Sequence, residues 1–313
     1  MVMHEPQSAA AVLMIRPARF GFNPETAASN ALQQPPAAAQ RAAVQSAALA
    51  EFDAVAATLR AAGVAVYVAA DAPEPAKPDA VFPNNWVSFH RDGRVVLYPM
   101  QAPSRRAERR EELVAEVAHA GGFRVSGTLD LSYREAQGQF LEGTGSLVLD
   151  RAARVAYACL SPRTDLDVLG DFAQRLDYDP VAFEAFDQEG RPIYHTNVLM
   201  AVGSRFAVVC AEAIAEPRQR GEIRSRLEAT GHEIVEITHT QMRAFAGNCL
   251  ELAARGGNAI VLSQTAWKAF DAGQRAILER HGAILPVAIP TIERVGGGGV
   301  RCMLAEIHLP KRA

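Results

Sequence analysis

The 313-residue sequence is poor in lysine: of its 32 basic residues, only Lys77, Lys268 and Lys311 are lysines. The formal net charge is −3, so the chain has no excess of positive charge for binding nucleic acid or a membrane surface. No apolar run approaches the roughly 20 residues that a membrane span needs. The N-terminus also lacks a basic segment followed by a long apolar stretch. These absences favour a cytoplasmic protein with neither a nucleic acid nor a membrane as its partner.

Cysteine is also scarce. The four cysteines, Cys159, Cys210, Cys249 and Cys302, are far apart and form no C-x-x-C pair, which argues against a disulfide framework or a zinc knuckle. No dinucleotide fingerprint is present, because the glycine run Gly296–Gly299 does not open a helix after a strand. The sequence therefore predicts reduced thiols, no metal and no organic cofactor.

No linker is long or polar enough to divide the chain, so residues 1–313 are expected to form a single domain. Short apolar runs come in pairs across polar turns, as at Phe89 and Val95, and such pairs predict β-hairpins. Helical spacing follows in five segments: Ala38–Ala62, Arg105–Ala120, Leu166–Leu176, Arg218–Ala229 and Thr265–His281. The runs expected as strands include Val198–Val202, Leu250–Ala253 and Cys302–Ile307. The order of strand pair, helix and strand recurs about five times, which favours α/β modules of ββαβ type arranged radially over a doubly wound parallel sheet.

The glycine run ends in V-R-C, so that Cys302 follows a backbone able to approach a ligand closely. Cys302 is either a nucleophile at the floor of a pocket or a buried structural cysteine. A thiolate nucleophile needs an acid–base partner. His195, in I-Y-H-T-N-V, opens an apolar run and is the strongest candidate among the eight histidines. Glu142, in F-L-E-G-T-G-S, has too apolar a setting for a merely solvated carboxylate, and can orient His195 or bind a cationic group.

Two further segments are open to more than one interpretation. Asp79, Asn84 and Asn85 lie in P-D-A-V-F-P-N-N-W, where the asparagines can form turns or offer amides to a pocket. The segment Ala18–Asn30 can form a lid over such a pocket or a series of turns.

Taken together, these segments resemble the guanidino-group modifying enzyme superfamily of arginine deiminases, dimethylarginine dimethylaminohydrolases and amidinotransferases. The resemblance is carried, in order, by F-L-E-G-T-G-S, I-Y-H-T-N, A-G-N-C-L-E-L and G-G-G-V-R-C-M. P-D-A-V-F-P-N-N-W, followed by A-P-S-R-R, is most similar to the dimethylarginine hydrolases and the citrulline-utilisation hydrolases. The resemblance implies a five-bladed α/β propeller and a hydrolase of non-peptide C–N bonds.

The same resemblance implies a role for each matching residue. Cys302 would be the nucleophile, His195 the general acid and base, and Glu142 an active-site carboxylate. The pocket around the planar carbon would be lined by Asp79, Asn84 and Asn85, with Asn197 beyond His195, and the substrate α-carboxylate would bind Arg105 and Arg163. An arginine fork matches a carboxylate bidentately. A cationic His195 is expected to lower the pKa of the Cys302 thiol.

Two departures from the superfamily bear on the substrate. Asn85 stands where arginine-processing relatives have aspartate, and Asn197 stands where deiminases carry aspartate two residues after the histidine. A buried guanidinium needs compensating carboxylates, whereas a neutral ureido group needs partners that donate and accept, as an amide does. We therefore expect a ureido amino acid such as citrulline. An amidinotransferase on the same Cys–His pair and a non-catalytic amino-acid binding protein remain alternatives, and a homo-oligomer is possible.

Overall fold

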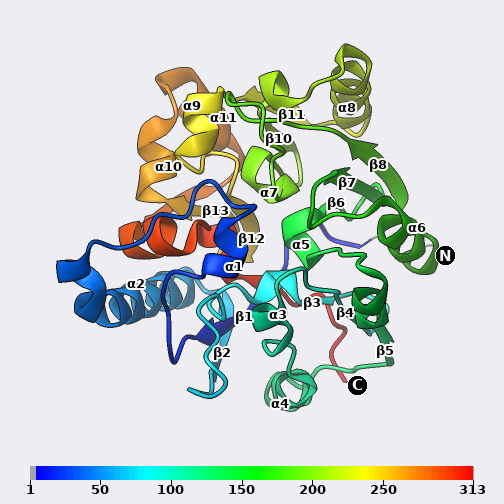
Figure 1. Ribbon diagram of the computed structural model, residues 1–313. Helices are drawn as coiled ribbons and strands as arrows, with labels where there is room; N and C mark the ends of the chain where they lie inside the picture. The colour runs from blue at the N-terminus through cyan, green and yellow to red at the C-terminus, as the bar shows by residue number, and fades with distance from the viewer. Residues whose placement is uncertain (1–4, 313) are drawn as a thin grey trace.

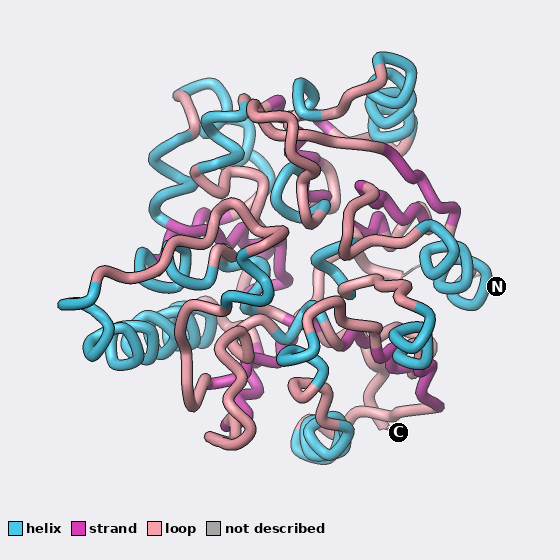
Figure 2. Tube along the Cα trace, in the orientation of Figure 1, coloured by secondary structure: helices cyan, strands magenta, loops and turns pink. Residues whose placement is uncertain are grey.

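The computed structural model describes residues 5–312 and contains five three-stranded sheets. The sheets are arranged in a ring, with the longer helices at its periphery (Figures 1 and 2). In every sheet the middle strand pairs antiparallel with one neighbour and parallel with the other. The prediction of a five-bladed α/β propeller of ββαβ modules is thereby confirmed. Within the described residues, none of the helices has the length and apolar character required to cross a membrane.

Each blade contains three strands and at least one helix, with the following bounds. Blade 1 consists of β15 (Ala305–Glu306), β1 (Ala11–Arg16), α2 (Arg41–Ala61) and β2 (Ala65–Ala70). Blade 2 consists of β3 (Val87–Phe89), β4 (Arg94–Leu97), α4 (Glu111–Ala120) and β5 (Gly127–Asp130). Blade 3 consists of β6 (Val148–Asp150), β7 (Val155–Cys159), α6 (Leu166–Leu176) and β8 (Asp179–Phe183). Blade 4 consists of β9 (Met200–Val202), β10 (Phe206–Val209), α8 (Pro217–Ala229) and β11 (Glu233–Glu236). Blade 5 consists of β12 (Leu250–Ala254), β13 (Gly257–Ser263), α10 (Gln264–Ala269), α11 (Ala272–His281) and β14 (Ala283–Val287).

Short helices occupy the connections. The α-helical ones are α1 (Pro24–Ala27), α3 (Pro103–Arg106), α5 (Gly143–Ser146), α7 (Thr196–Leu199) and α9 (His239–Arg243). The 3-10 turns are η1 (Ala38–Gln40), η2 (Pro83–Asn85), η3 (Ser132–Gln137), η4 (Ala211–Ala213) and η6 (Val300–Met303), and η5 (Ile292–Gly296) is a π-helical turn. Several of these turns, α5 and α7 among them, point towards the centre of the ring in Figure 1.

The ring is closed by the two ends of the chain. The short C-terminal strand β15 pairs antiparallel with β1, so that Val12 lies opposite Glu306 and Leu13 opposite Ala305. Because β1 also pairs with β2, blade 1 is built from both ends of the sequence. This closure places Cys302, which directly precedes β15, at the centre of the molecule.

Local sequence explains the best-formed elements. Helix α6 begins at Asp165, whose side chain accepts from the backbone N–H groups of Asp167 and Val168, as an N-cap should. Its apolar positions form one stripe, and Phe172 on that stripe is fully buried against the sheet. The hairpin expected at Phe89 and Val95 is confirmed as β3–β4. The pairs Leu149/Val155 and Val202/Phe206, which likewise flank polar turns in the sequence, form the hairpins β6–β7 and β9–β10.

Four element boundaries differ from the expected ones. The segment Arg105–Ala120 forms two helices, α3 and α4, and Thr265–His281 is divided into α10 and α11 because Asp271 caps a second helix start. The expected strand Val198–Val202 is shortened to β9, since Val198 belongs to α7. The expected strand Cys302–Ile307 is shortened to β15, since Cys302 lies in the η6 turn.

Candidate active site

The glycine run before Cys302 is packed rather than flexible. The π-helical turn η5 ends at Gly297, which has a positive φ of 66° and is favoured there because it lacks a Cβ. A Cβ on Gly297 would lie 2.6 Å from the side-chain nitrogen of Asn30, and one on Gly298 would lie 2.9 Å from the Phe82 ring. The glycines therefore let neighbouring groups close tightly over the turn that presents Cys302.

Two side-chain amides donate to the sulfur of Cys302. Asn248 Nδ2 lies 3.3 Å from Sγ and Asn197 Nδ2 lies 3.5 Å from it. Asn248 is held by the backbone N–H of Arg301, which donates to its Oδ1 at 3.0 Å. Burial raises the pKa of the Cys302 thiol, although the Asn248 hydrogen bond acts in the opposite direction. The expected lowering of this pKa is therefore not observed, because the thiol is buried away from water and His195 is not charged beside it.

His195 and Glu142 occupy equivalent places in successive blades, each as the N-cap residue of a short helix before a strand. His195 Nε2 lies 2.9 Å from Glu142 Oε2, and since a carboxylate only accepts, Nε2 carries the proton. Burial lowers the pKa of His195 to about 4. Although burial acts to raise the pKa of Glu142, Arg163 and His195 outweigh it and hold that pKa well below its usual range. The pair is therefore a neutral imidazole oriented by an ionised carboxylate.

Gly145 allows Asn85 and His195 to approach each other. A Cβ at Gly145 would lie 2.4 Å from Asn85 Nδ2 and 2.7 Å from His195 Nδ1. Real side-chain atoms do not reach such distances, so a residue larger than glycine would displace one of the two. Because glycine has no Cβ, this position leaves room for both the His195 imidazole and the Asn85 amide.

The orientation of the Asn85 amide follows from Arg105. Arg105 Nη1 donates to Asn85 Oδ1 at 2.8 Å, and because a guanidinium has no acceptor, the oxygen must face it. Asn85 Nδ2 is then left as a buried donor without a partner among the described residues. Arg105 also donates to both oxygens of Glu108 and to the Phe82 carbonyl. Burial raises the pKa of Glu108 to about 7 despite this pairing.

Asp79 supplies an acceptor that has no partner. Its Oδ2 accepts from Asn23 Nδ2 at 2.8 Å and from Thr26 Oγ1 at 3.1 Å, whereas its Oδ1 is buried without a partner among the described residues. Gln33 Nε2 is a further buried donor in the same situation. Burial raises the pKa of Asp79 against the pull of Arg105. The site thus holds free donors and a free acceptor together.

Arg163 contacts the segment that covers the site. Its Nη2 donates to the Thr26 carbonyl at 2.7 Å and its Nε to Ser29 Oγ at 2.9 Å. Its guanidinium carbon lies 5.0 Å from the centroid of the Tyr194 ring, whose hydroxyl donates to the Gly297 carbonyl. Helix α1 and the residues that follow it lie over the centre of the ring in Figure 1. Of the two interpretations of Ala18–Asn30, the structure agrees with a cover over the site.

Several of the side chains just described line one small cavity. Its walls are Thr26, Asn30, Gln33, Asp79, Phe82, Asn85, Arg105, Arg163, Tyr194, His195, Gly296, Gly297, Gly298 and Cys302. The cavity has a volume of only about 10 Å³, roughly the space of one water molecule. An amino acid can therefore enter only when the covering segment moves.

Three of the predicted site residues do not reach the cavity. Among the described residues that form its walls, Glu142, Asn84 and Asn197 are absent. Glu142 lies behind His195, and Asn197 contacts the sulfur of Cys302. The side-chain oxygen and nitrogen of Asn84 are buried without partners in the described part of the chain. The other predicted residues, Cys302, His195, Asp79, Asn85, Arg105 and Arg163, line the cavity together.

Sequence reasoning missed Asn248, which it treated only as part of a strand segment. The available signal was the glycine before it: a Cβ on Gly247 would lie 2.4 Å from the Val198 carbonyl oxygen. Glu142 has a similar setting, since it also lies beside a glycine and shortly before a strand. The pattern was not recognised here because a lone asparagine is a common turn residue.

The sequence profile of the family described as N,N dimethylarginine dimethylhydrolase, eukaryotic, matches residues 16–309. The chain belongs to this family. Membership places it among hydrolases of non-peptide C–N bonds, in the superfamily that the motifs resemble. No curated protein matches the chain at a significant level.

Solved structures of low sequence identity share the fold. The N-terminal domain of ArgZ, an arginine dihydrolase from the ornithine–ammonia cycle in cyanobacteria, was solved bound to substrate and superposes with a TM-score of 0.70 at 18% identity, covering 96% of this chain and 99% of that domain. The apo ArgZ structure gives a TM-score of 0.68 at 17% identity, covering 97% of this chain, and the chain spans 40% of its length. The dimethylarginine hydrolase DDAH from Pseudomonas aeruginosa, complexed with citrulline, gives 0.66 at 16% identity, covering 96% of this chain and 100% of that one.

Proposed function

We propose that the protein hydrolyses the C–N bond of a neutral ureido amino acid such as citrulline, through a covalent intermediate on Cys302. The observation that carries this proposal is the free donor Asn85 Nδ2 and the free acceptor Asp79 Oδ1 in one small cavity with Cys302 and His195. Family membership supports a hydrolase, and the donor set of the cavity supports the substrate class.

A ureido group satisfies both free atoms. Its carbonyl oxygen accepts from Asn85 Nδ2, and its N–H groups donate to Asp79 Oδ1. A guanidinium has donors only, so it would leave Asn85 Nδ2 facing another donor, at the cost of an unsatisfied buried group, about 1–3 kcal/mol or more. Arg105 maintains this selectivity, because it forces the oxygen of Asn85 away from the substrate.

The remaining residues bind and orient the substrate. Arg163 and the free Gln33 Nε2 are placed to receive the α-carboxylate, because both line the cavity and Arg163 otherwise contacts only neutral groups of the cover and Glu142. Arg105 is already engaged by Glu108 and Asn85, so we assign it the positioning of Asn85 rather than the carboxylate.

The covalent step begins with a neutral Cys302 thiol and a neutral imidazole. The thiol proton passes to His195 as Sγ attacks the ureido carbon, and the carbonyl electron pair moves to the oxygen, where Asn85 Nδ2 donates to it. The tetrahedral adduct then expels a nitrogen, which takes the proton from His195. Water, activated by the neutral His195, attacks the carbonyl carbon of the resulting S-carbamoyl (thiocarbamate) intermediate, and the Cys302 sulfur leaves and takes the proton back from His195.

The products are the same whichever C–N bond breaks first. Citrulline and one water give ornithine, ammonia and carbon dioxide, since a carbamate formed on either nitrogen decomposes. Glu142 remains ionised throughout and stabilises the imidazolium that forms during each proton transfer. Besides the substrate, the proposed reaction uses only water and residues of the chain.

The experiment is product analysis with the purified protein and citrulline, arginine or the methylated arginines, each with and without added glycine. We expect ornithine and ammonia from citrulline, independent of glycine. An amidinated glycine product would favour the amidinotransferase, and binding without turnover would favour an amino-acid binding protein. Cys302→Ser serves as the control: it should retain the wild-type melting temperature and lose turnover, and retained turnover would reject the covalent scheme.

A further inference from the structure

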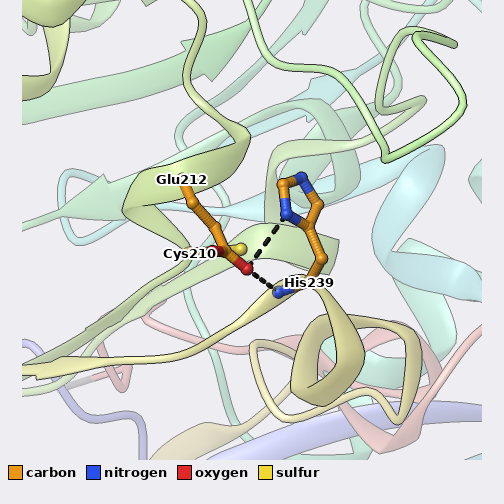
Figure 3. A group of neighbouring side chains, drawn as sticks. All are labelled: Cys210, Glu212 and His239. Atoms are coloured by element: carbon orange, nitrogen blue, oxygen red, sulfur yellow. Dashed lines mark hydrogen bonds and ion pairs between the residues drawn. The ribbon is translucent and has the colours of Figure 1, made fainter.

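A second group of chemically active side chains lies in blade 4, away from the cavity. Cys210 follows β10, Glu212 lies in the η4 turn, and His239 is the first residue of α9. Figure 3 shows the three side chains directed towards one another. One ligand atom from each lies within 4.8 Å of the other two. None of the three lines the cavity that contains Cys302.

The protonation of His239 follows from its neighbours. Its Nε2 lies 3.1 Å from the Phe186 carbonyl oxygen, which only accepts, so Nε2 carries a proton. In the neutral ring, Nδ1 is then a bare lone pair, and it lies 3.0 Å from Glu212 Oε1, another acceptor. Two facing acceptors repel each other unless a proton or a cation lies between them. The same Oε1 also accepts from the backbone N–H of His239, which fixes the carboxylate in place.

We propose that Cys210, Glu212 and His239 bind a zinc ion. A thiolate, an imidazole nitrogen and a carboxylate oxygen form a ligand set that Zn²⁺ favours. The His239 ring shows the arrangement common in metal sites, in which the nitrogen that does not bind the metal donates to a backbone carbonyl. A simple His–Glu ion pair would account for the nitrogen and the oxygen, but not for a buried sulfur beside both.

Zinc binding needs a small rearrangement, because His239 Nδ1 and Glu212 Oε1 lie 3.0 Å apart and must separate, while the three ligand atoms lie within 4.8 Å of one another. Metal–ligand distances of about 2.0–2.3 Å place the ligand atoms of a tetrahedral zinc about 3.3–3.8 Å apart. Glu212 would have to weaken its hydrogen bond to the His239 backbone N–H and rotate, which its 50% exposed side chain allows. Its exposure also leaves the fourth position open to water. Burial raises the pKa of Cys210 to about 12, against the smaller effect of the Ala213 backbone N–H, so zinc binding must displace a tightly held thiol proton and should weaken as the pH falls.

The ion would join two segments of blade 4 and its connections. Cys210 and Glu212 belong to the turn after β10, and His239 begins the connection towards blade 5. Through Phe186 the same site contacts the loop that leads to Tyr194 and His195. A metal here therefore clamps the outer connections of blade 4 and does not enter the reaction.

The test uses Cys302→Ser protein, since Cys302 and His195 can also bind zinc. Zinc chloride is titrated into this protein after dialysis against a chelator, with calorimetry giving stoichiometry and affinity. Cobalt chloride in a parallel titration reports a sulfur ligand through a thiolate-to-cobalt charge-transfer band. We expect one zinc per chain, a raised melting temperature and the charge-transfer band.

Variants made in the Cys302→Ser background test which residues bind the zinc ion. Cys210→Ser should remove the cobalt band and weaken zinc binding about a hundredfold or more, and the exposed Glu212→Gln, which leaves the core intact, should weaken it about tenfold or more. Two matched controls should change nothing: Cys159→Ser, another buried cysteine, and His281→Ala, whose ring lies 2.9 Å from Glu233 without a sulfur nearby. Absence of zinc binding, or unchanged binding in both Cys210→Ser and Glu212→Gln, would overturn the proposal.

Discussion

At the scale of single residues, the account depends on how the buried sulfur of Cys302 becomes reactive. Asn248 and Asn197 both donate to it, and such donors stabilise the thiolate more than the thiol. In Asn248→Ala one donor is lost. A hydrogen bond to a charged group contributes about 1.5–3 kcal/mol, so we expect kcat to fall by about tenfold to a hundredfold with KM little changed.

The rate of Cys302 alkylation against pH gives an independent readout of this variant. The thiol pKa should rise further in Asn248→Ala, which a purely structural role of Asn248 would not produce. An unchanged kcat together with an unchanged alkylation profile would show that Asn248 does not activate Cys302.

The pH dependence follows from the neutral thiol and imidazole. The reactive form, thiolate with imidazolium, has the same number of protons as the resting form, so its population does not depend on pH between the two pKa values. With the pKa of His195 lowered to about 4, protonation of His195 should not reduce kcat/KM for citrulline between pH 7 and pH 5, where an unperturbed histidine would titrate. Glu108, with a pKa of about 7, titrates in this range, so the profile is measured in Glu108→Gln as well. A loss of activity centred near pH 6.5 in both proteins would contradict the geometry of the His195–Glu142 pair.

Residue identities were predictable where several motifs occurred in order. Cys302, His195, Asp79, Asn85, Arg105 and Arg163 were all expected at the site and line one cavity. The engagement of Arg105 by Glu108 was not predictable, because adjacent charges in a helical segment usually form exposed pairs. The fold buries this pair completely, and no feature of the local sequence indicates that.

At the scale of elements, short helices before the strands place two of the candidate catalytic residues. Glu142 precedes α5 and His195 precedes α7, and both helices are followed at once by the first strand of a blade. Hairpins could be predicted because their two strands are adjacent and apolar. The third strands β5, β8 and β14 were not expected, because β5 and β8 have no continuous apolar run, and the apolar run of β14 contains a proline, which argues against a strand.

Gly145 in α5 provides a test at this scale. Its backbone φ is not in the left-handed region, so Gly145→Ala should fold, while the new Cβ displaces Asn85 or His195. Turnover should fall by about a hundredfold or more, since a misplacement of about 1 Å has effects of that size. The control is Gly170→Ala in α6, where a Cβ meets no atom within 4 Å. Full activity in Gly145→Ala would show that the close contact does not matter.

At the scale of the whole molecule, a buried cluster of charges links distant blades. Glu306 in β15 accepts from Arg301 Nη2 at 2.7 Å and lies 3.9 Å from Arg151 Nε, which comes from the turn between β6 and β7. Arg151 in turn donates to Glu5 near the N-terminus. The sequence could not predict this cluster, because partners so far apart leave no local pattern.

A homo-oligomer stays a prediction.

Replacement of Glu306 tests the importance of this cluster. Glu306→Gln leaves two buried arginines short of negative charge, and such a loss costs about 3–5 kcal/mol. Urea unfolding should show a correspondingly lower midpoint. Glu233→Gln, which removes the charge from an exposed pair with Arg280, should cost less than about 1 kcal/mol. Equal effects of the two substitutions would mean that the central cluster adds no stability.

The central claim is that the free amide nitrogen of Asn85 selects a neutral ureido group. Its most direct test is the ratio of kcat/KM for citrulline to kcat/KM for arginine, measured in wild type and in Asn85→Asp. The account predicts a wild-type ratio well above one, and a fall of at least about tenfold in Asn85→Asp, where a donor is replaced by an acceptor. Faster turnover of arginine than of citrulline by the wild-type protein would contradict it.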